Sequence, residues 1–308
     1  MDITPASLQI LFNAFDMSYQ SGLSSPQEVW TEKLAMTRPS STSQNTYPFM
    51  GLAPQLREWV GERQVQSVTA YKYVIANKHY ESTVEVDKND IEDDQYGLYA
   101  PIIVEMGVSA RKWPDTVTIP LLQAGQTTLC YDNQNFFDTQ HPIDMLTPSK
   151  GVQSNLFTSQ ALTPEHYQEV RVAMMSLIGE NSLPLGVRPN LLIVPPQLEA
   201  TARQILHADY IVAQTGTAPM IGGTNVFKGT ADLLVVDMLA NQPTEWYLAD
   251  TTRTVKPLVW QLRQAPRFVQ LIDPQSPNVF NLKKFLYGTD ARGAAGFGLW
   301  QFMAKGVA

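Results

Sequence analysis

The sequence predicts an α+β protein, and three observations lead to that prediction. Residues 64–75 and 80–86 are rich in β-branched and aromatic side chains, and the polar stretch 76–79 separates them, as in two antiparallel strands joined by a turn. An apolar stripe at helical spacing follows directly. From about residue 163 onward, helical patterns alternate with short buried strands, and the C-terminal part favours strands again.

The predicted hairpin needs a surface to pack on. A strand of roughly ten residues spans about 30 Å at about 3.3 Å per residue, and two strands alone are marginally stable in water. The partner surface could belong to the same chain or to another one. The sequence leaves both alternatives open.

The N-terminal residues predict a helix followed by an extended arm. Thr4 and Pro5 form a typical helix start, and Gly22 supplies a stop. The stripe between them consists of Leu8, Leu11, Phe12, Phe15 and Tyr19. Residues 37–48 are rich in Pro, Ser and Thr, so we expect an extended segment that lies along a surface.

The long helix after the hairpin carries its own signals. Five acidic residues within 87–94 would complement the positive end of its dipole. The expected apolar stripe is Leu98, Ile102, Met106 and Trp113. Pro101 is tolerable only in a first turn, whereas Pro114 and Pro120 predict two shorter helices with a bend near Trp113 and with Asp115 capping the second.

The remaining elements follow from local patterns. We expect helices from Thr163 to Gly179 and from Pro195 to Leu206, with buried strands at 190–194 and 233–236. Farther on, a Gly-rich connection at 288–296 should join strands at 279–286 and 297–303.

Composition indicates a chain that contacts other chains. Among its 308 residues, 17% are charged, against about 25% in a typical soluble domain. Interface cores are depleted of charge, so an extensive interface would explain this composition, although an ordinary enzyme with a polar, uncharged surface would also fit. The net charge of −7 argues against broad neutralisation of nucleic-acid phosphates.

Cysteine usage and the absence of targeting signals indicate the compartment. Cys130 is the single cysteine, so no intrachain disulfide can form, and we expect it to be a small buried hydrophobe. No Lys or Arg precedes Lys33, and no apolar run is long enough to span a membrane. These features predict a cytoplasmic protein that is not bound to membranes.

The sequence predicts no catalytic residue, no cofactor and no metal site. The four histidines are scattered without metal-ligand spacing. Asp138 and His141 could form an acid–base pair of a hydrolase. The chain has no Gly-x-Ser-x-Gly motif, however, so a turn held by Asx-type hydrogen bonds is the favoured interpretation.

Several strings resemble the major head (capsid) subunit of Mu-like phages. They are Leu56-Arg-Glu-Trp-Val-Gly61, Tyr80-Glu-Ser-Thr-Val84, Asp90-Ile-Glu-Asp-Asp94, Thr128-Leu-Cys-Tyr-Asp132 with Asn135-Phe-Phe-Asp138 and His141-Pro142, and Tyr287-Gly-x-Asp-Ala-Arg-Gly293. The resemblance extends from about Leu11 to Phe302. It implies the tailed-phage and herpesvirus (Hong Kong 97-like) capsid fold, with an N-terminal arm, an extended hairpin loop, a peripheral domain with a spine helix, and an axial domain.

On this chain the resemblance implies four parts. The arm with its amphipathic helix would be residues 1–60 and the extended hairpin loop 61–89. The peripheral domain would comprise 90–128 and 250–308. The axial domain would be 129–249.

The implied function is structural. The chain would self-assemble through pentamers and hexamers into an icosahedral head that encloses double-stranded DNA without sequence-specific binding. No N-terminal extension is long enough for a fused scaffolding domain, so we expect a separate scaffolding protein, a portal protein and a possible decoration protein as partners. Assembly would take place in the host cytoplasm and the product would be the virion. Two alternatives stay open: a cytoplasmic hydrolase using Asp138 and His141, and a non-viral nanocompartment shell protein of the same fold.

Contacts between subunits would come from the arm and the hairpin, because both reach beyond a compact body. The residues expected there are Phe12, Phe15, Tyr71, Tyr73, Asn77, Lys78, His79 and Tyr80. An exposed strand edge is a hazard in a monomer, but it becomes a contact when a neighbouring subunit covers it.

Overall fold

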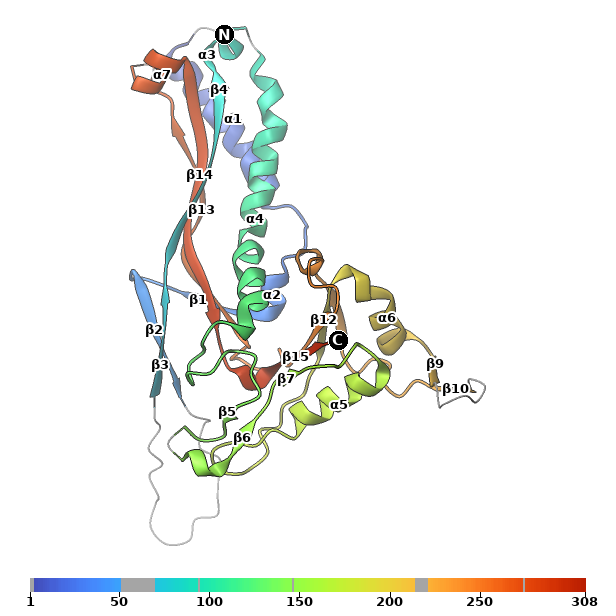
Figure 1. Ribbon diagram of the computed structural model, residues 1–308. Coiled ribbons are helices and arrows are strands. Elements are labelled where there is room, and N and C mark those ends of the chain that lie inside the picture. Colours follow the sequence, from blue (N-terminus) through green and yellow to red (C-terminus); the bar gives the residue numbers. More distant parts are fainter. Residues whose placement is uncertain (1–2, 51–69, 94, 146, 214–220, 274) are drawn as a thin grey trace.

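The computed structural model describes residues 3–50, 70–93, 95–145, 147–213, 221–273 and 275–308. Figure 1 shows an elongated body, built from a long sheet and long helices, and a second body at one end that holds a smaller sheet and shorter helices. The chain ends in the second body.

The elongated body is organised around a four-stranded sheet. Its order is β1–β13–β14–β4, in which β13, β14 and β4 are antiparallel neighbours and β1 runs parallel to β13. β14 is therefore hydrogen-bonded along both of its sides. The strand bounds are Ala35–Pro39 (β1), Leu258–Leu271 (β13), Lys284–Phe297 (β14) and Lys78–Asp87 (β4).

Two helices pack beside this sheet, α1 (Pro5–Leu23) and α4 (Ala100–Gln123). The predicted N-cap of α1 is confirmed, because the Thr4 side chain accepts a hydrogen bond from a backbone amide of the first turn. The two helix backbones touch where Gly22 of α1 meets Gly107 of α4. A Cβ on either glycine would collide with a backbone carbonyl of the other helix, so only glycine permits this close approach.

α4 is one continuous helix of 24 residues, and the predicted split near Trp113 is wrong. Pro101 falls in the first turn, as expected, whereas Pro114 and Pro120 lie inside the helix. Each of the two interior prolines removes one backbone amide donor. Tertiary packing offsets that loss, because the Trp113 ring is held edge-on against Trp260, with 4.8 Å between their ring centroids.

The buried stripe of α4 also differs from the predicted one. Met106 and Trp113 are buried as expected, but Leu98 and Ile102 are 70% and 48% exposed. Leu98 lies before the helix, in a 3₁₀ turn at Gln95–Tyr99. Two large apolar side chains, one in this turn and one in the first turn of α4, are therefore exposed to solvent.

Asp115 caps a different helix from the predicted one. Its carboxylate accepts hydrogen bonds from the Thr31 amide (2.7 Å), the Thr31 hydroxyl (2.7 Å) and the Trp30 amide (3.2 Å). These groups lie at the start of α2 (Trp30–Leu34). Asp115 thus fixes the N-terminal segment to the middle of α4, and this role requires residues more than eighty positions apart.

The predicted pairing of residues 64–75 with 80–86 is wrong wherever the structure describes these residues. β3 (Ala70–Ala76) pairs with β2 (Gln44–Met50), and β4 pairs with β14 over ten residues. Residues 64–69 lie outside the described residues. Pairing with the buried strand β14 gives β4 a longer ladder of hydrogen bonds than a hairpin with β3 would give. β3 pairs with β2 in a separate two-stranded sheet.

Two further predictions about this region need correction. Residues 37–48, expected to be an extended arm, belong largely to strands β1 and β2. The acidic run does not begin α4: Asp87 caps the short helix α3 (Lys88–Glu92), where its side chain accepts a hydrogen bond from Asn89 N.

The predicted Gly-rich connection at 288–296 lies within β14. Its glycines make room for neighbouring side chains, since a Cβ on Gly293 would touch the Trp113 ring and one on Gly296 would collide with Ile75. The strand predicted at 279–286 begins instead as helix α7 (Pro277–Leu282). Glycine here serves close packing rather than a turn.

The second body contains a five-stranded sheet in the order β11–β8–β12–β15–β7. β15 comes from the C-terminus and pairs with β12, so the last residues of the chain belong to this sheet and not to the elongated body. The strand bounds are Asp232–Val235 (β11), Leu191–Val194 (β8), Glu245–Ala249 (β12), Met303–Val307 (β15) and Leu156–Phe157 (β7).

Helices α5 (Pro164–Met175) and α6 (Glu199–His207) flank this sheet, and both confirm predictions. The Thr163 side chain caps α5 as expected. Two small two-stranded sheets complete the body, formed by β5 (His141–Pro142) with β6 (Val152–Gln153) and by β9 (Tyr210–Ala213) with β10 (Ile221–Thr224). Among the described residues, no helix is long and apolar enough to cross a membrane.

Replacing Asp115 by Ala should lower the free energy of unfolding by about 2 kcal/mol, because three donors at the start of α2 lose a buried charged acceptor. Urea denaturation followed by circular dichroism measures the change. The matched control is Glu105→Ala on the exposed face of the same helix, which should stay within about 0.5 kcal/mol of the parent. Equal unfolding midpoints for the two variants would contradict the capping role.

Candidate functional site

The candidate subunit contacts Phe12 and Phe15 pack within their own chain. Phe12 stacks on Phe268 with 5.5 Å between ring centroids, and Phe15 meets Tyr287 edge-on at 5.0 Å. Phe15 is only 2% exposed. In this conformation both side chains attach α1 to the long sheet, and the Phe15 ring is buried while Phe12 stays partly exposed.

Two of the candidate tyrosines are likewise engaged. The Tyr73 hydroxyl accepts a hydrogen bond from the Phe297 amide (3.3 Å), and the Tyr80 ring lies 5.1 Å from that of Trp113. Burial raises the pKa of both phenols above the ordinary value for tyrosine. The side chain of Tyr71 lies outside the described part of the chain.

Asn77 anchors the junction between β3 and β4. Its amide nitrogen donates to Ser40 Oγ (2.9 Å), and its carbonyl oxygen accepts from Gln261 Nε2 (2.7 Å). The adjacent Lys78 and His79 are exposed. The structure therefore gives Asn77 a role within the chain and leaves Lys78 and His79 as predicted subunit contacts.

The long sheet has one covered face and one open face. On β14, Phe285 and Tyr287 are buried toward α1 and α4, and the residues between them point to the opposite side. This open face includes Val269 and Leu271 of β13, which are 36% and 44% exposed. Our sequence analysis missed this face, because residues 263–271 show no regular alternation of apolar and polar side chains; the alternation is one of burial in the folded strand.

Apolar side chains also gather at the far end of the elongated body. Phe280 and Leu282 of α7 are 84% and 58% exposed, and Leu98 lies in the turn that joins α3 to α4 at the same end. Exposed apolar side chains that gather in one place are typical of surfaces that bind other proteins.

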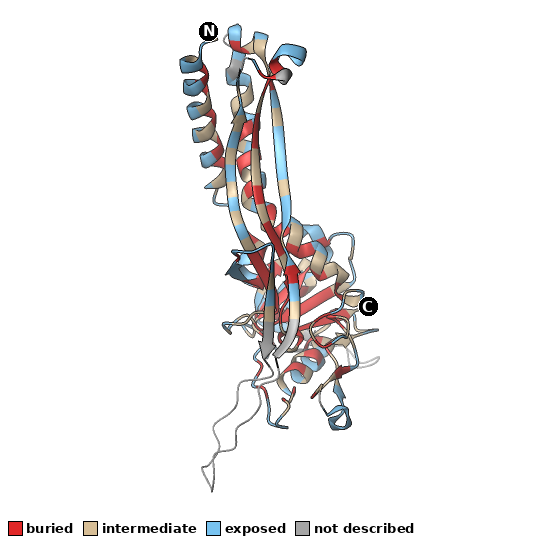
Figure 2. Ribbon diagram, turned by 90° about the vertical axis from the view of Figure 1, so that its left-hand side faces the viewer, coloured by how far each residue is buried: buried red, intermediate tan, exposed pale blue. Residues whose placement is uncertain are grey.

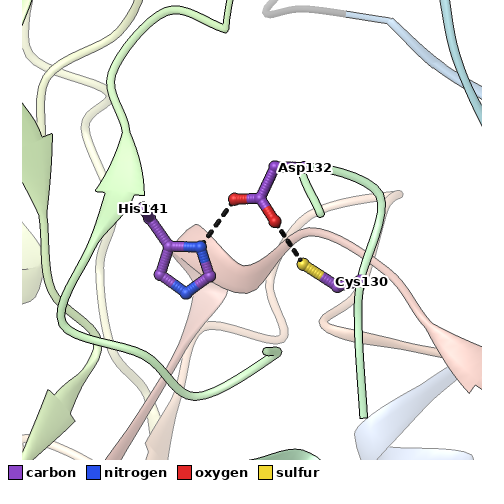
Figure 3. A group of neighbouring side chains, drawn as sticks. All are labelled: Cys130, Asp132 and His141. Carbon is purple, nitrogen blue, oxygen red and sulfur yellow. Dashed lines mark hydrogen bonds and ion pairs between the residues drawn. The ribbon is translucent and has the colours of Figure 1, made fainter. Parts of the chain in front are cut away.

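A buried group of three side chains lies near the second body: Cys130, Asp132 and His141 (Figure 3). His141 Nδ1 lies 2.6 Å from Asp132 Oδ2, and the Cys130 thiol donates to Asp132 Oδ1 at 2.8 Å. All three are at most 5% exposed. The His141 ring also stacks on Trp300, with 4.0 Å between ring centroids.

The acid–base pair weighed for a hydrolase does not form, because His141 contacts Asp132 and not Asp138. The Asp138 carboxylate instead accepts from Gln140 N (3.0 Å), which is the Asx-type turn that the sequence favoured. The sequence offered no signal for Asn155, whose side-chain oxygen lies 3.2 Å from His141 Nε2.

Asn155 connects segments that are distant in the sequence. Its side-chain nitrogen donates to the carbonyls of Phe136 (2.8 Å) and Met303 (3.1 Å), and its side-chain oxygen accepts from Asp138 N (3.0 Å). These bonds fix the orientation of the amide. Both ring nitrogens of His141 therefore lie within hydrogen-bond distance of side-chain oxygens, which hold the imidazole ring in place.

The group lacks the arrangement of a nucleophilic site. Asp132 lies between the thiol and the imidazole, so the imidazole cannot take the thiol proton directly. Burial, together with the neighbouring Asp132, raises the pKa of the Cys130 thiol far above its ordinary value. Thiol, carboxylate and imidazole are ligand types that zinc uses, but each already has a hydrogen-bond partner here. The arrangement is that of a structural polar core.

Comparison with known proteins decides the family. The family model described as Mu-like prophage major head subunit gpT matches residues 8–161, 153–239 and 238–307. The chain belongs to this family. It is 32% identical over 301 residues to the major capsid protein of Escherichia phage Mu, a match that covers 98% of this chain and 73% of the relative. The Mu-like prophage FluMu major head subunit of Haemophilus influenzae is 29% identical, with 99% and 74% covered.

Solved structures agree on the fold. The procapsid of bacteriophage JBD30 superimposes with a TM-score of 0.60 at 30% identity, covering 99% of this chain and 76% of that one. The JBD30 capsid gives 0.57 at 27% identity, covering 78% and 100%. A virus-like particle from Pyrococcus furiosus, at 10% identity and a TM-score of 0.53, shares the fold alone. The predicted capsid fold is confirmed.

The chain is a major capsid protein of the Mu-like type, a structural subunit of the phage head that associates with copies of itself. It is not an enzyme, and the hydrolase alternative is not favoured. The relatives that match along nearly the whole chain are phage head subunits, so the nanocompartment alternative is not favoured either.

Cys130 should be unreactive in the folded chain. A thiol-specific disulfide reagent should leave it unmodified between about pH 7 and 9, where a free thiol with a pKa of about 8.5 reacts readily, because its raised pKa and burial keep it protonated and inaccessible. Unfolding in urea should restore full reaction. Since Cys130 is the single cysteine, the signal reports on it alone. Rapid labelling of folded protein would contradict this account.

Proposed function

We propose that copies of this chain close into pentamers and hexamers, which together form an icosahedral head around double-stranded DNA. The observation that carries the proposal is the elongated body (Figure 2), which has an open sheet face, an exposed edge strand β4 and a separate β2–β3 sheet. A monomer gains nothing from such unpaired edges. In a closed shell, neighbouring copies cover them, and ring closure makes each later contact intramolecular.

We also propose a division of the chain into capsid domains that revises the expected boundaries. The pairing of β2 with β3 supports an extended loop at about 44–76 instead of 61–89, since β4 is part of the long sheet. The pairing of β15 with β12 supports placing 303–307 with the axial domain and the rest of 250–308 with the peripheral domain. The spine helix would be α4.

The expected partners follow the same model. We propose assembly in the host cytoplasm with a separate scaffolding protein and a portal protein, and virion localisation for the product. A decoration protein is a further candidate partner, because one JBD30 capsid structure is described as decorated with minor capsid protein trimers. The net charge of −7 supports enclosure of DNA without tight binding to it.

Replacing residues 51–69 by a short Gly/Ser linker tests the role of the β2–β3 loop. The variant keeps the described strands, including the hydrogen bond from the Tyr47 hydroxyl to Gln261 (2.8 Å), so we expect a soluble subunit with an unchanged melting temperature. It should form no closed shells, because we propose that this segment contacts neighbouring copies.

Negative-stain microscopy and sedimentation of the variant and the parent, each with the scaffolding protein, provide the measurement. The matched control is Ser182→Gly in an exposed turn of the second body, where glycine relieves a positive φ of 61° and shells should form normally. Normal shells from the shortened loop would show that this loop is not an assembly element.

A further inference from the structure

Arg292 lies on the open face of the long sheet. The residues on either side of it, Ala291 and Gly293, face α4: Ala291 lines the space beside the helix, and a Cβ on Gly293 would touch the Trp113 ring. Successive side chains of a strand point to opposite faces. The guanidinium of Arg292 therefore points away from the helices, between Gln264 of β13 and His79 of β4.

Within the described residues, the Arg292 guanidinium has no partner. Its Nε is buried and makes no hydrogen bond, and the side chain forms no ion pair there. The carboxylate that shares its face two residues away, Asp290, is already held by Arg267 through two hydrogen bonds of 2.7 and 2.9 Å. Gln264 donates to the same carboxylate at 3.3 Å.

Strand β4 adds two exposed side chains to the open face near Arg292. His79, the register partner of Arg292, forms no ion pair in the described part of the chain. Glu81, the register partner of Asp290, accepts a hydrogen bond from Thr83 Oγ1 (2.8 Å) and forms no ion pair there either. Arg267 and Asp290 neutralise each other. A half-buried guanidinium with an unsatisfied N–H group is unfavourable, so a partner that supplied an acceptor would be strongly preferred.

We infer that Arg292 binds a carboxylate of a second copy of this chain. Its planar fork matches a carboxylate with two parallel hydrogen bonds. The chain carries 29 acidic residues against 22 Lys and Arg, so a neighbouring copy brings an excess of carboxylates. The contact would lie on the same open face as the apolar Val269 and Leu271, where a packed neighbour would exclude water. The inference rests on the proposed closed-shell assembly.

The test compares Arg292→Gln with the parent in the absence of DNA. We expect the melting temperature of the unassembled subunit to stay unchanged or to rise, because an uncompensated charge is removed. The concentration needed for shell assembly should increase roughly tenfold or more, since a charge-assisted hydrogen bond between copies is lost. Arg188→Gln is the matched control: the Arg188 side chain is exposed and contacts no carboxylate among the described residues, and the backbone amide that donates to Asp250 is kept, so its assembly should match the parent.

Each other outcome overturns the inference. A lower melting temperature for the Arg292→Gln subunit would assign Arg292 a role within the chain. If this variant assembles without DNA at the same concentration as the parent, Arg292 binds no carboxylate of a second copy; its partner is then a phosphate group or it has none. If the parent itself forms no shells, the proposed assembly fails and the inference fails with it, whereas a defect confined to Arg292→Gln leaves the proposed assembly intact.

A second variant identifies the partner directly. Arg292→Lys places an amine at this position, which a carbodiimide couples to a carboxylate in contact. In shells assembled from a mixture of isotopically light and heavy subunits, we expect mixed-isotope peptide pairs that contain residue 292. Links found only within one chain, or no links at all, would overturn the inference.

Discussion

The pairing of β14 with β4 on one side and β13 on the other is the constraint on which the elongated body depends. β14 is hydrogen-bonded along both edges, and the sheet around it packs one face against α1 and α4 and leaves the other face open. Because β4 pairs with β14, it does not pair with β3. β3 pairs with β2 instead, and these two strands form a separate sheet.

The composition of β14 makes this arrangement possible. Its glycines let the Trp113 ring and Ile75 pack directly against the strand backbone, so helix and loop are both fixed to the centre of the sheet. After β14 the chain passes through a 3₁₀ turn into β15, which joins the sheet of the second body. Asn155 binds a backbone carbonyl at this crossing, so the buried polar group near His141 holds the two bodies together.

Local signals in the sequence predicted part of this structure. The signals for α1, α5 and α6 are local: a capping residue, a proline at the helix start or an apolar stripe lies within the helix or next to it. These three helices were predicted. The family followed from short strings such as that ending at Gly293. Three features could not be predicted in the same way. The pairing of β4 and the continuity of α4 each depend on a partner more than a hundred residues away. The cap formed by Asp115 depends on another helix. The buried site was missed for the same reason, since Asp132 and Asn155 approach His141 only in the folded chain.

Hydrogen–deuterium exchange of free subunits and assembled shells tests the central claim most directly, namely that β14 forms a rigid centre before assembly and that the open surfaces become covered afterwards. The account predicts strong protection of β14 amides already in the free subunit. On assembly, new protection should appear at β2, β3 and β4. Rapid exchange of β14 in the free subunit, or unchanged exchange of β2, β3 and β4 in shells, would contradict it.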